Sequence, residues 1–379
     1  MYDVIVIGAG AVGSATAYQA AKAGRSVLLL EQYAIDHQRG SSHGYSRIIR
    51  YAYDHPAYVE LAKAAYPAWS ALEEDCGETL YVRTGGLDFA TPGESSFVTT
   101  VNTLAQTNIP HEVISAAEVR ELFPQFRPDP DMIALYQKDA GVLRASRAVQ
   151  AHVRLARQYG AVVCDNTPVL AITPVTEGVE VRTANETFAG ARLVLASGAW
   201  LKPMLLPLGL NLPLQPIAPQ ENYLTPIEAE LFTTNHFPIW MAHLQAEYGN
   251  ILYGLPSIDG SGVKIGLHGG PPIDPASPER IPDTQLAQKM LDFARTFIPQ
   301  AAGSVASSRV CLYTMTPDEH FIIDQHPEYP QVIIASCCSG HAFKFSTLLG
   351  SILTDLALSG ETVHDIGLFK LSRFDNIEA

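Results

Sequence analysis

The sequence predicts a protein of mixed α/β and α+β class, with one discontinuous domain on a parallel sheet and a second, β-rich domain. Three observations support this prediction. The chain has 379 residues, which exceeds the usual size of a single hydrophobic core. Its N-terminus reads as a strand, a glycine-rich turn, a helix and a strand. Its middle, from about residue 205 to 280, changes to short strand-like runs among prolines, glycines and aromatic residues.

The N-terminal segment forms a strand–helix–strand unit. Residues 2–7 (YDVIVI) are an apolar run that is typical of a strand buried on both faces of a parallel sheet. Residues 14–22 are alanine-rich with a helical pattern, and Gly24 is placed to end this helix. Residues 26–31 (SVLLLE) read as a second buried strand, which completes a βαβ unit.

The turn between this first strand and the helix has glycines at the spacing GxGxxG. Gly8 makes the tight exit from the strand, Gly10 lets the backbone approach a pyrophosphate, and Gly13 lets the helix pack closely on the sheet. The helix N-terminus then faces the phosphates with its partial positive charge. The match continues through Ala17, Ala21, Gly24, Val27 and Glu31. The segment therefore predicts a FAD/NAD(P)-binding Rossmann-like domain, against the alternative of a glycine turn without a ligand.

Glu31 ends the second strand, where its carboxylate can accept hydrogen bonds from ribose hydroxyls, and an acid there disfavours NADP. The motif alone leaves FAD and NAD open, although its place at the N-terminus favours FAD. Residues 193–200 (LVLASGAW) resemble a small-residue turn that is common in flavoproteins of this fold. Any strand followed by a turn has the same appearance.

The remaining pattern divides the chain between the two domains. Further helices are expected at 57–75, 145–158, 283–297 and 342–359, and further strands at 178–183, 187–197, 251–255, 263–267 and 331–335. We expect the FAD-binding domain to comprise 1–83, 145–213 and 318–379, and the substrate domain to comprise 84–144 and 214–317.

Composition limits the class of partner. The chain has 25 Lys+Arg against 39 Asp+Glu, a net charge of -14, which disfavours nucleic acids and anionic membranes. No leader peptide and no apolar span of about 18 residues is visible. The five cysteines are odd in number and show no metal-pair spacing, so free thiols in a cytoplasmic protein without a metal are expected.

Two polar clusters carry candidate chemistry. His43, Arg47 and Arg50 stand close together in GSSHGYSRIIRYAY, and arginine binds carboxylates through two parallel hydrogen bonds. Surface arginines in ion pairs are the alternative. In GVKIGLH, Lys264 and His268 share one face of an apolar strand, and the alternative is a lysine at a sheet edge.

Two further segments lie near the C-terminus: CLYTMTPDEHFIID at 311–324 and SGHAFKF at 339–345. The second begins a helix whose N-terminal amides can face an electron-rich oxygen of a flavin. Lys344 falls on the first turn of that helix, where an ordinary exposed lysine is the alternative.

Together with the N-terminal fingerprint, these segments resemble the monomeric sarcosine oxidase and N-methyltryptophan oxidase family of the D-amino-acid-oxidase superfamily, with pipecolate oxidases as more distant members. The resemblance runs in order from Met1 to about Phe374. It implies a FAD-dependent oxidase that converts a secondary amino acid to an imine and reduces O2 to hydrogen peroxide. A monomer that acts on a small amino acid is expected.

The resemblance also implies roles for individual residues. Cys311 matches the cysteine that is bonded covalently to FAD, and Lys264 matches the lysine that activates oxygen. Arg50 and Lys344 match the pair that holds the substrate carboxylate. His268, Tyr253 and Tyr313 match polar residues around the substrate amine, and His43 and Arg47 match residues beside the flavin ring. Further cofactor contacts are expected at Ala11, Val12, Gln32, Ser41, Ile48, Val169, Ser197, Gly198, Trp200, Gly340, Ala342 and Phe343, besides Lys344.

Four departures from the family pattern leave the identity of the amine open. Ser42 replaces a histidine, Tyr45 replaces a polar residue, and Ala342 replaces a glycine, where its methyl group can crowd the substrate. The segment 241–250 looks a few residues longer than in sarcosine oxidases. A flavin dehydrogenase, an oxidase of primary or D-amino acids, and a non-catalytic FAD-binding protein remain alternatives.

Overall fold

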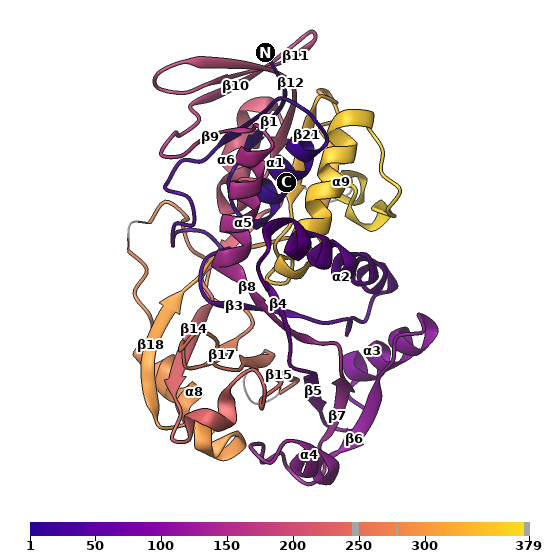
Figure 1. Ribbon diagram of the computed structural model, residues 1–379, viewed down its shortest axis with the longest axis vertical. Coiled ribbons are helices and arrows are strands. Elements are labelled where there is room, and N and C mark those ends of the chain that lie inside the picture. Colours follow the sequence, from indigo (N-terminus) through magenta and orange to yellow (C-terminus); the bar gives the residue numbers. More distant parts are fainter. Residues whose placement is uncertain (245–249, 278, 375–379) are drawn as a thin grey trace.

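The computed structural model describes residues 1–244, 250–277 and 279–374, and it arranges them around two eight-stranded sheets. Figure 1 shows one sheet with its helices in the upper half and the other in the lower half. This is the predicted fold class: a Rossmann-like domain beside a second, β-rich domain.

The upper sheet has a parallel core in the order β21-β12-β1-β2-β9. Its strands are β1 (Tyr2–Ile7), β2 (Val27–Leu30), β9 (Val162–Cys164), β12 (Thr187–Leu195) and β21 (Val332–Ser336). Three antiparallel strands extend it: β10 (Ala171–Val175), β11 (Gly178–Arg182) and β20 (Ile322–Gln325). The predicted βαβ unit is confirmed, and strands from both ends of the chain share this sheet.

Four helices cover one face of the upper sheet: α1 (Ala11–Lys22), α2 (Pro56–Cys76), α5 (Ala145–Gln158) and α9 (Ser346–Ser359). They pack so closely because small residues meet at the contacts. A Cβ on Gly13 would lie 1.9 Å from the carbonyl oxygen of Gly8, and one on Gly350 of α9 would lie 2.6 Å from the backbone of Ala15. Gly13 therefore has the packing role that its place in the fingerprint predicts.

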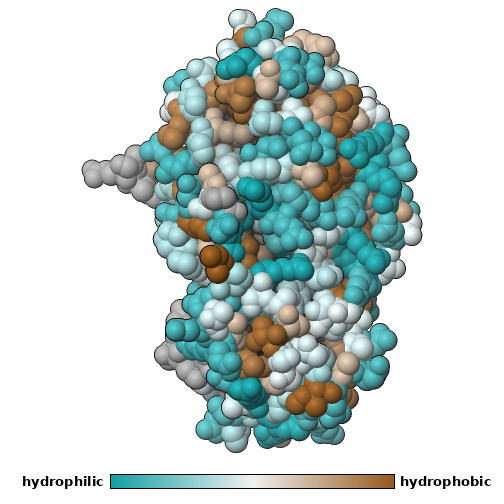
Figure 2. Space-filling model, turned by 90° about the vertical axis from the view of Figure 1, so that its left-hand side faces the viewer, coloured by the Kyte–Doolittle hydropathy of each residue, from teal (hydrophilic) through white to brown (hydrophobic). Residues whose placement is uncertain are grey.

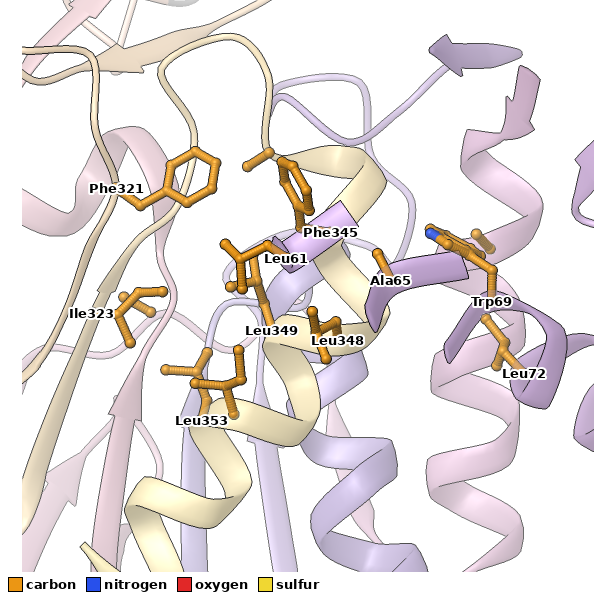
Figure 3. Close-up of a cluster of buried hydrophobic side chains, with 14 of the residues drawn as sticks. Leu61, Ala65, Trp69, Leu72, Phe321, Ile323, Phe345, Leu348, Leu349 and Leu353 are labelled. Carbon is orange, nitrogen blue, oxygen red and sulfur yellow. The ribbon is translucent and has the colours of Figure 1, made fainter. Parts of the chain in front are cut away.

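A hydrophobic cluster joins α2 to the start of α9 (Figure 3). Leu61 of α2 lies beside Phe345 and Leu349 from the α9 segment, and Trp69 lies two turns further along α2. Trp69 also donates a hydrogen bond from Nε1 to the carbonyl oxygen of Lys344, at 2.7 Å. The core of the upper domain thus fixes the backbone that carries Lys344.

The lower sheet has the order β18-β14-β17-β16-β15-β5-β7-β6. Its strands are β5 (Gly86–Ala90), β6 (Glu112–Ser115), β7 (Ile133–Gln137), β14 (Gln220–Thr225), β15 (Ile239–Ala242), β16 (Leu252–Leu255), β17 (Val263–Leu267) and β18 (Ser304–Val310). Neighbours are antiparallel except β5 and β15, which are parallel. The sheet therefore combines strands from two separate stretches of the chain, and the precise domain boundaries stay a prediction.

Three helices accompany the lower sheet: α3 (Ser95–Gln106), α4 (Ala116–Leu122) and α8 (Thr284–Phe297). Two small sheets complete the fold, one with β3 (Ser46–Ile49), β4 (Tyr81–Arg83) and β8 (Gly141–Arg144), the other with β13 (Gln215–Ile217) and β19 (Tyr313–Met315). A five-residue helix, α6 (Leu201–Leu205), follows β12.

The expected helices and strands are found to within a few residues, with one change at the C-terminus. The stretch 342–359 begins as a 3-10 turn, Phe343–Phe345, and only then becomes α9. Helices α3 and α4 and many strands of the lower domain were not predicted.

The distribution of hydrophobic residues on the surface and the state of the cysteines agree with what the composition predicts. On the face shown in Figure 2, hydrophobic residues form small separate groups among hydrophilic ones. Within the described residues, no helix has the length and apolar character needed to cross a membrane. All five cysteines are free thiols.

Candidate active site

One cavity of about 550 Å³ runs from the glycine-rich turn after β1 to the buried lysines of the lower sheet and the α9 segment. It is lined by nearly all of the predicted site residues: Gly8, Gly10, Ala11, Val12, Glu31, Gln32, Ser41, His43, Arg47, Ile48, Arg50, Val169, Ser197, Gly198, Trp200, Tyr253, Lys264, His268, Cys311, Tyr313, Gly340, Ala342, Phe343 and Lys344. Gly13 is the predicted residue that does not line it. The fold therefore brings residues from the whole length of the chain to one site.

At the upper end of the cavity, the acid at the end of β2 holds the glycine-rich turn. The Glu31 carboxylate accepts hydrogen bonds from the backbone N–H groups of Ala9 (2.8 Å) and Tyr33 (3.0 Å). Ser42 Oγ accepts from the N–H of Ala11 at 2.9 Å, at the N-terminus of α1. Ser42, a departure from the family pattern, is thus built into the dinucleotide-binding turn.

The loop before β3 is organised by Arg47. Its guanidinium donates hydrogen bonds to the carbonyl oxygens of Ser41 (2.8 Å), His43 (2.9 Å) and Ser46 (2.8 Å). His43 is buried at the cavity wall, and neither ring nitrogen has a hydrogen-bond partner. Burial, with a further contribution from Arg47, lowers the pKa of His43 to about 4, so its ring is neutral at pH 7.

These unpaired groups fit a bound dinucleotide. Buried polar atoms in proteins nearly always find a partner. The ring nitrogens of His43 and the hydroxyl of Ser197 have none, yet both residues line the cavity between the glycine-rich turn and Lys264. FAD supplies phosphate, ribose and ring atoms that accept or donate hydrogen bonds along such a path. The residues present therefore fit this cofactor.

Lys264 lies on β17 between β14 and β16, so the alternative of a lysine at a sheet edge is wrong. The residue is 2% exposed, and its ammonium group forms an ion pair with the carboxylate of Glu221 on β14. Burial lowers the pKa of Lys264, and the charge of Glu221 opposes that shift. A buried ammonium group thus faces the cavity with a dedicated counter-charge.

Glu221 was not predicted from the sequence. It is also 2% exposed, and burial alone would raise its pKa. The charges of Lys264 and Arg47 outweigh burial and lower the pKa of Glu221 to about 2, so its carboxylate is ionised at neutral pH. Its strand, QENYLT, is rich in polar residues, so no apolar pattern in the sequence marked Glu221 as buried.

Two cations meet around the ring of Tyr53, another residue missed in the sequence. Lys344 is buried, and its ammonium donates hydrogen bonds to the hydroxyl of Tyr53 and the carbonyl oxygen of His341, both at 2.7 Å. The Arg50 guanidinium lies 5.4 Å from the Tyr53 ring centre and forms an ion pair with buried Asp88 of β5. The expected Arg50–Lys344 pair is therefore brought together, and Lys344 is not an exposed helix residue.

Burial and the neighbouring charge of Arg50 hold the pKa of Lys344 well below its usual value. Asp88 balances the charge of Arg50, whereas the hydrogen bonds of Lys344 go to two neutral oxygens, those of Tyr53 and His341. Asp88 was not predicted either, although it stands alone as an acid in an otherwise apolar strand.

His268 and two tyrosines complete the lower wall. The rings of His268 and Tyr313 lie 5.5 Å apart, and a Cβ on Gly340 would come within 2.5 Å of both. Gly340 also has a φ of +77°, a conformation that favours glycine. Burial, then Lys344 and Arg50, lower the pKa of His268 to about 4, so its ring is neutral near pH 7.

Cys311 is 6% exposed at the cavity wall. Burial, and then the charge of Glu221, raise the pKa of its thiol to about 12, so the free protein holds it protonated at neutral pH. Ala342 and Met241 also line the cavity, and Ala342 belongs at the same time to the hydrophobic core of the upper domain. Of the lengthened segment 241–250, residues 245–249 lie outside the described part of the chain.

Comparisons with known proteins place this geometry in a family. The family model described as FAD dependent oxidoreductase matches residues 3–356. The monomeric sarcosine oxidase of Arthrobacter sp. (strain TE1826) is 35% identical, and the match covers 98% of this chain and 96% of the relative. The N-methyl-L-tryptophan oxidase of Yersinia pestis (strain Pestoides F) is 34% identical, with 98% and 99% covered. The solved structure of NikD, an unusual amino acid oxidase of nikkomycin biosynthesis, has a TM-score of 0.87 at 26% identity and 97% coverage of both chains.

Proposed function

Since the chain belongs to the FAD dependent oxidoreductase family, we propose that it is an oxidase of secondary amino acids, N-methylated or cyclic. The carbon–nitrogen bond of the substrate is oxidised to an imine, which leaves and hydrolyses. Two electrons and two protons pass in the end to O2 and give hydrogen peroxide. The observation that carries the proposal is the single cavity joining the dinucleotide-binding turn to buried cationic groups.

The residues of the chain have distinct tasks in this proposal. Lys344, with Arg50 beside it, binds the substrate carboxylate, and His268, Tyr253 and Tyr313 surround the amine. Lys344 and Arg50 place positive charge beside His268, and such charge disfavours an ammonium group, so the substrate can bind as its free base. Lys264 holds a positive charge where negative charge develops on oxygen.

FAD supplies the redox chemistry when it is bound. The glycine-rich turn and Glu31 would hold its ADP portion, and His43 and Ser197 would pair with it along the cavity. The protein binds, orients and tunes this cofactor.

The proposed substrate class can be tested by peroxide production under air. The purified enzyme is offered sarcosine, other N-methyl amino acids, proline, pipecolate and D-amino acids. We expect peroxide with a secondary amino acid and a higher kcat/KM than with any primary one. Preference for a primary or D-amino acid, or flavin reduction without peroxide, would contradict the proposal and favour the alternatives.

We also propose that FAD is bonded to Cys311. The support is the buried thiol on the cavity wall and the match of its sequence context to a covalent-flavin family. The wild-type protein should keep its yellow colour in an acid-precipitated pellet, and Cys311→Ala should release the colour into the supernatant. Cys338→Ala is the matched control, since Cys338 lines the same cavity. Flavin that washes out of the wild-type pellet would contradict the assignment.

We propose a monomer that acts in the cytoplasm. The free thiols suit a reducing compartment, and relatives named monomeric sarcosine oxidase support the oligomeric state.

A further inference from the structure

We infer that Glu221 is a positioning residue for Lys264: its carboxylate keeps the buried ammonium group protonated and fixed at the cavity wall. This inference rests on the proposed function, in which Lys264 supplies positive charge to the reaction with oxygen. It adds a residue that the family resemblance does not assign.

The strand register brings the two side chains together. β14 and β17 are antiparallel neighbours, with Tyr223 opposite Lys264 and Glu221 opposite Gly266. Side chains two residues apart on a strand share a face, so Glu221 and Tyr223 lie on the face that carries Lys264. Gly266 has no side chain, and the ring of Tyr253 fills the space beside it: a Cβ on Gly266 would lie 2.6 Å from the Tyr253 hydroxyl.

Both carboxylate oxygens of Glu221 are used. One forms the ion pair with the Lys264 ammonium, and the other accepts a hydrogen bond from the Tyr223 hydroxyl at 3.2 Å. Lys264 also donates a hydrogen bond to the carbonyl oxygen of Ser46, at 3.4 Å. The carboxylate is thus clamped from two sides, and it fixes the direction in which the lysine points.

The charged groups around Lys264 make its protonation depend on the carboxylate of Glu221. The titratable and charged groups around the pair are His43, Arg47, Tyr223, Tyr253, Arg309 and Cys311. Arg47 carries a fixed positive charge and disfavours a second one on Lys264. Burial disfavours it as well. Glu221 is the ionised acid that opposes both effects, so its loss lowers the pKa of Lys264.

The first test is the pH profile of flavin reoxidation in stopped flow, with rates expressed per bound flavin. The wild-type rate constant should stay level from pH 6 to 9. With Glu221→Gln it should fall with pH, by about tenfold per pH unit above the pKa of the ammonium group. At low pH, where Lys264 is still charged, the variant should match or exceed the wild type because a negative charge has been removed. Glu180→Gln, at an exposed position of β11, is the matched control and should leave the profile level.

The second test does not depend on activity. A lysine whose pKa is lower in the folded than in the unfolded protein releases its proton first from the folded state. The unfolded chain then binds more protons, and the free energy of unfolding rises with pH between the two pKa values. Glu221→Gln lowers the pKa of Lys264 in the folded protein further, so the stability of the variant rises with pH over a wider range than that of the wild type. The variant should therefore be less stable than the wild type at pH 6, and this difference in melting temperature should shrink toward pH 9. In the double variant Glu221→Gln, Lys264→Met, this pH dependence should disappear.

The outcomes separate the inference from the proposed function. If Lys264→Met slows reoxidation but Glu221→Gln leaves both pH profiles unchanged, the role of Glu221 is wrong and that of Lys264 stands. If Lys264→Met leaves reoxidation unaffected, the oxygen role on which the inference rests is wrong. A Glu221→Gln variant that loses the same stability and the same rate at every pH would show only a structural role and overturn the inference.

Discussion

Replacing Lys264 with methionine is expected to slow reoxidation of the reduced enzyme by oxygen about 100-fold or more, with a much smaller effect on reduction by substrate. The ammonium group lies in a site from which water is largely excluded, because the residue is 2% exposed. Interactions with developing negative charge are stronger there than in water. Methionine keeps an unbranched chain of similar length and removes only the charge.

Stopped-flow spectroscopy separates the two half-reactions. Anaerobic mixing with substrate gives the rate of reduction, and mixing of the reduced enzyme with oxygen gives the rate of reoxidation. Lys63→Met, on the surface of α2, is the matched control. Equal losses in both half-reactions would count against the role of Lys264. Because Lys264→Met leaves Glu221 unpaired, the double variant with Glu221→Gln serves if the single one folds poorly.

Replacing Lys344 with methionine is expected to lower kcat/KM for carboxylate-bearing amines by about ten- to a hundredfold, the equivalent of about 1.5–3 kcal/mol for one lost hydrogen bond to a charged group. The reason lies in the distribution of charge around Tyr53. Arg50 is already paired with Asp88, whereas the hydrogen bonds of Lys344 go to neutral oxygens. An ion pair with Lys344 should therefore contribute more to binding of the substrate carboxylate than an ion pair with Arg50.

Steady-state kinetics with matched substrates tests this role. The amide of the best substrate lacks the negative charge. Replacing Lys344 should therefore lower kcat/KM for this amide much less than it lowers kcat/KM for the parent acid. A loss of the same size for both compounds would contradict carboxylate binding. Since burial and Arg50 lower the pKa of Lys344, the wild-type KM for the acid should rise as alkaline pH removes the proton. The variant should not show this rise.

The fold of the upper domain followed from sequence because its signals are local and continuous. The run YDVIVI is buried along most of its length, and the spacing of Gly8, Gly10 and Gly13 determines the turn and the helix contact. The lower sheet has strands of four to seven residues, too short for a periodic pattern to appear. Its order depends on contacts between distant segments, which no single window of sequence contains.

The candidate site was predicted where a residue belongs to a motif and missed where its role depends on a partner across the fold. Lys264, Arg50 and Lys344 stand in recognisable segments, and all three line the cavity. Their partners Glu221 and Asp88 stand in short strands without a motif. The register of β14 with β17 shows which base Glu221 meets, and the fold brings Asp88 of β5 to Arg50, which follows β3. A lone acid in an apolar strand was a signal for Asp88, whereas the polar strand QENYLT held no such signal for Glu221.

The parallel pairing of β5 with β15 has a consequence for how the chain folds. Gly86 pairs with Ile239, so the two halves of the lower sheet are joined across a long stretch of chain that includes β9, β10, β11 and β12 of the upper sheet. During synthesis, β5, β6 and β7 emerge early and must wait for β15 with an unprotected edge. Contacts so distant in sequence slow folding and prolong exposure of that edge. The pairing of β5 with the distant β15 thus makes the nascent chain vulnerable to aggregation until β15 has been synthesised and has paired.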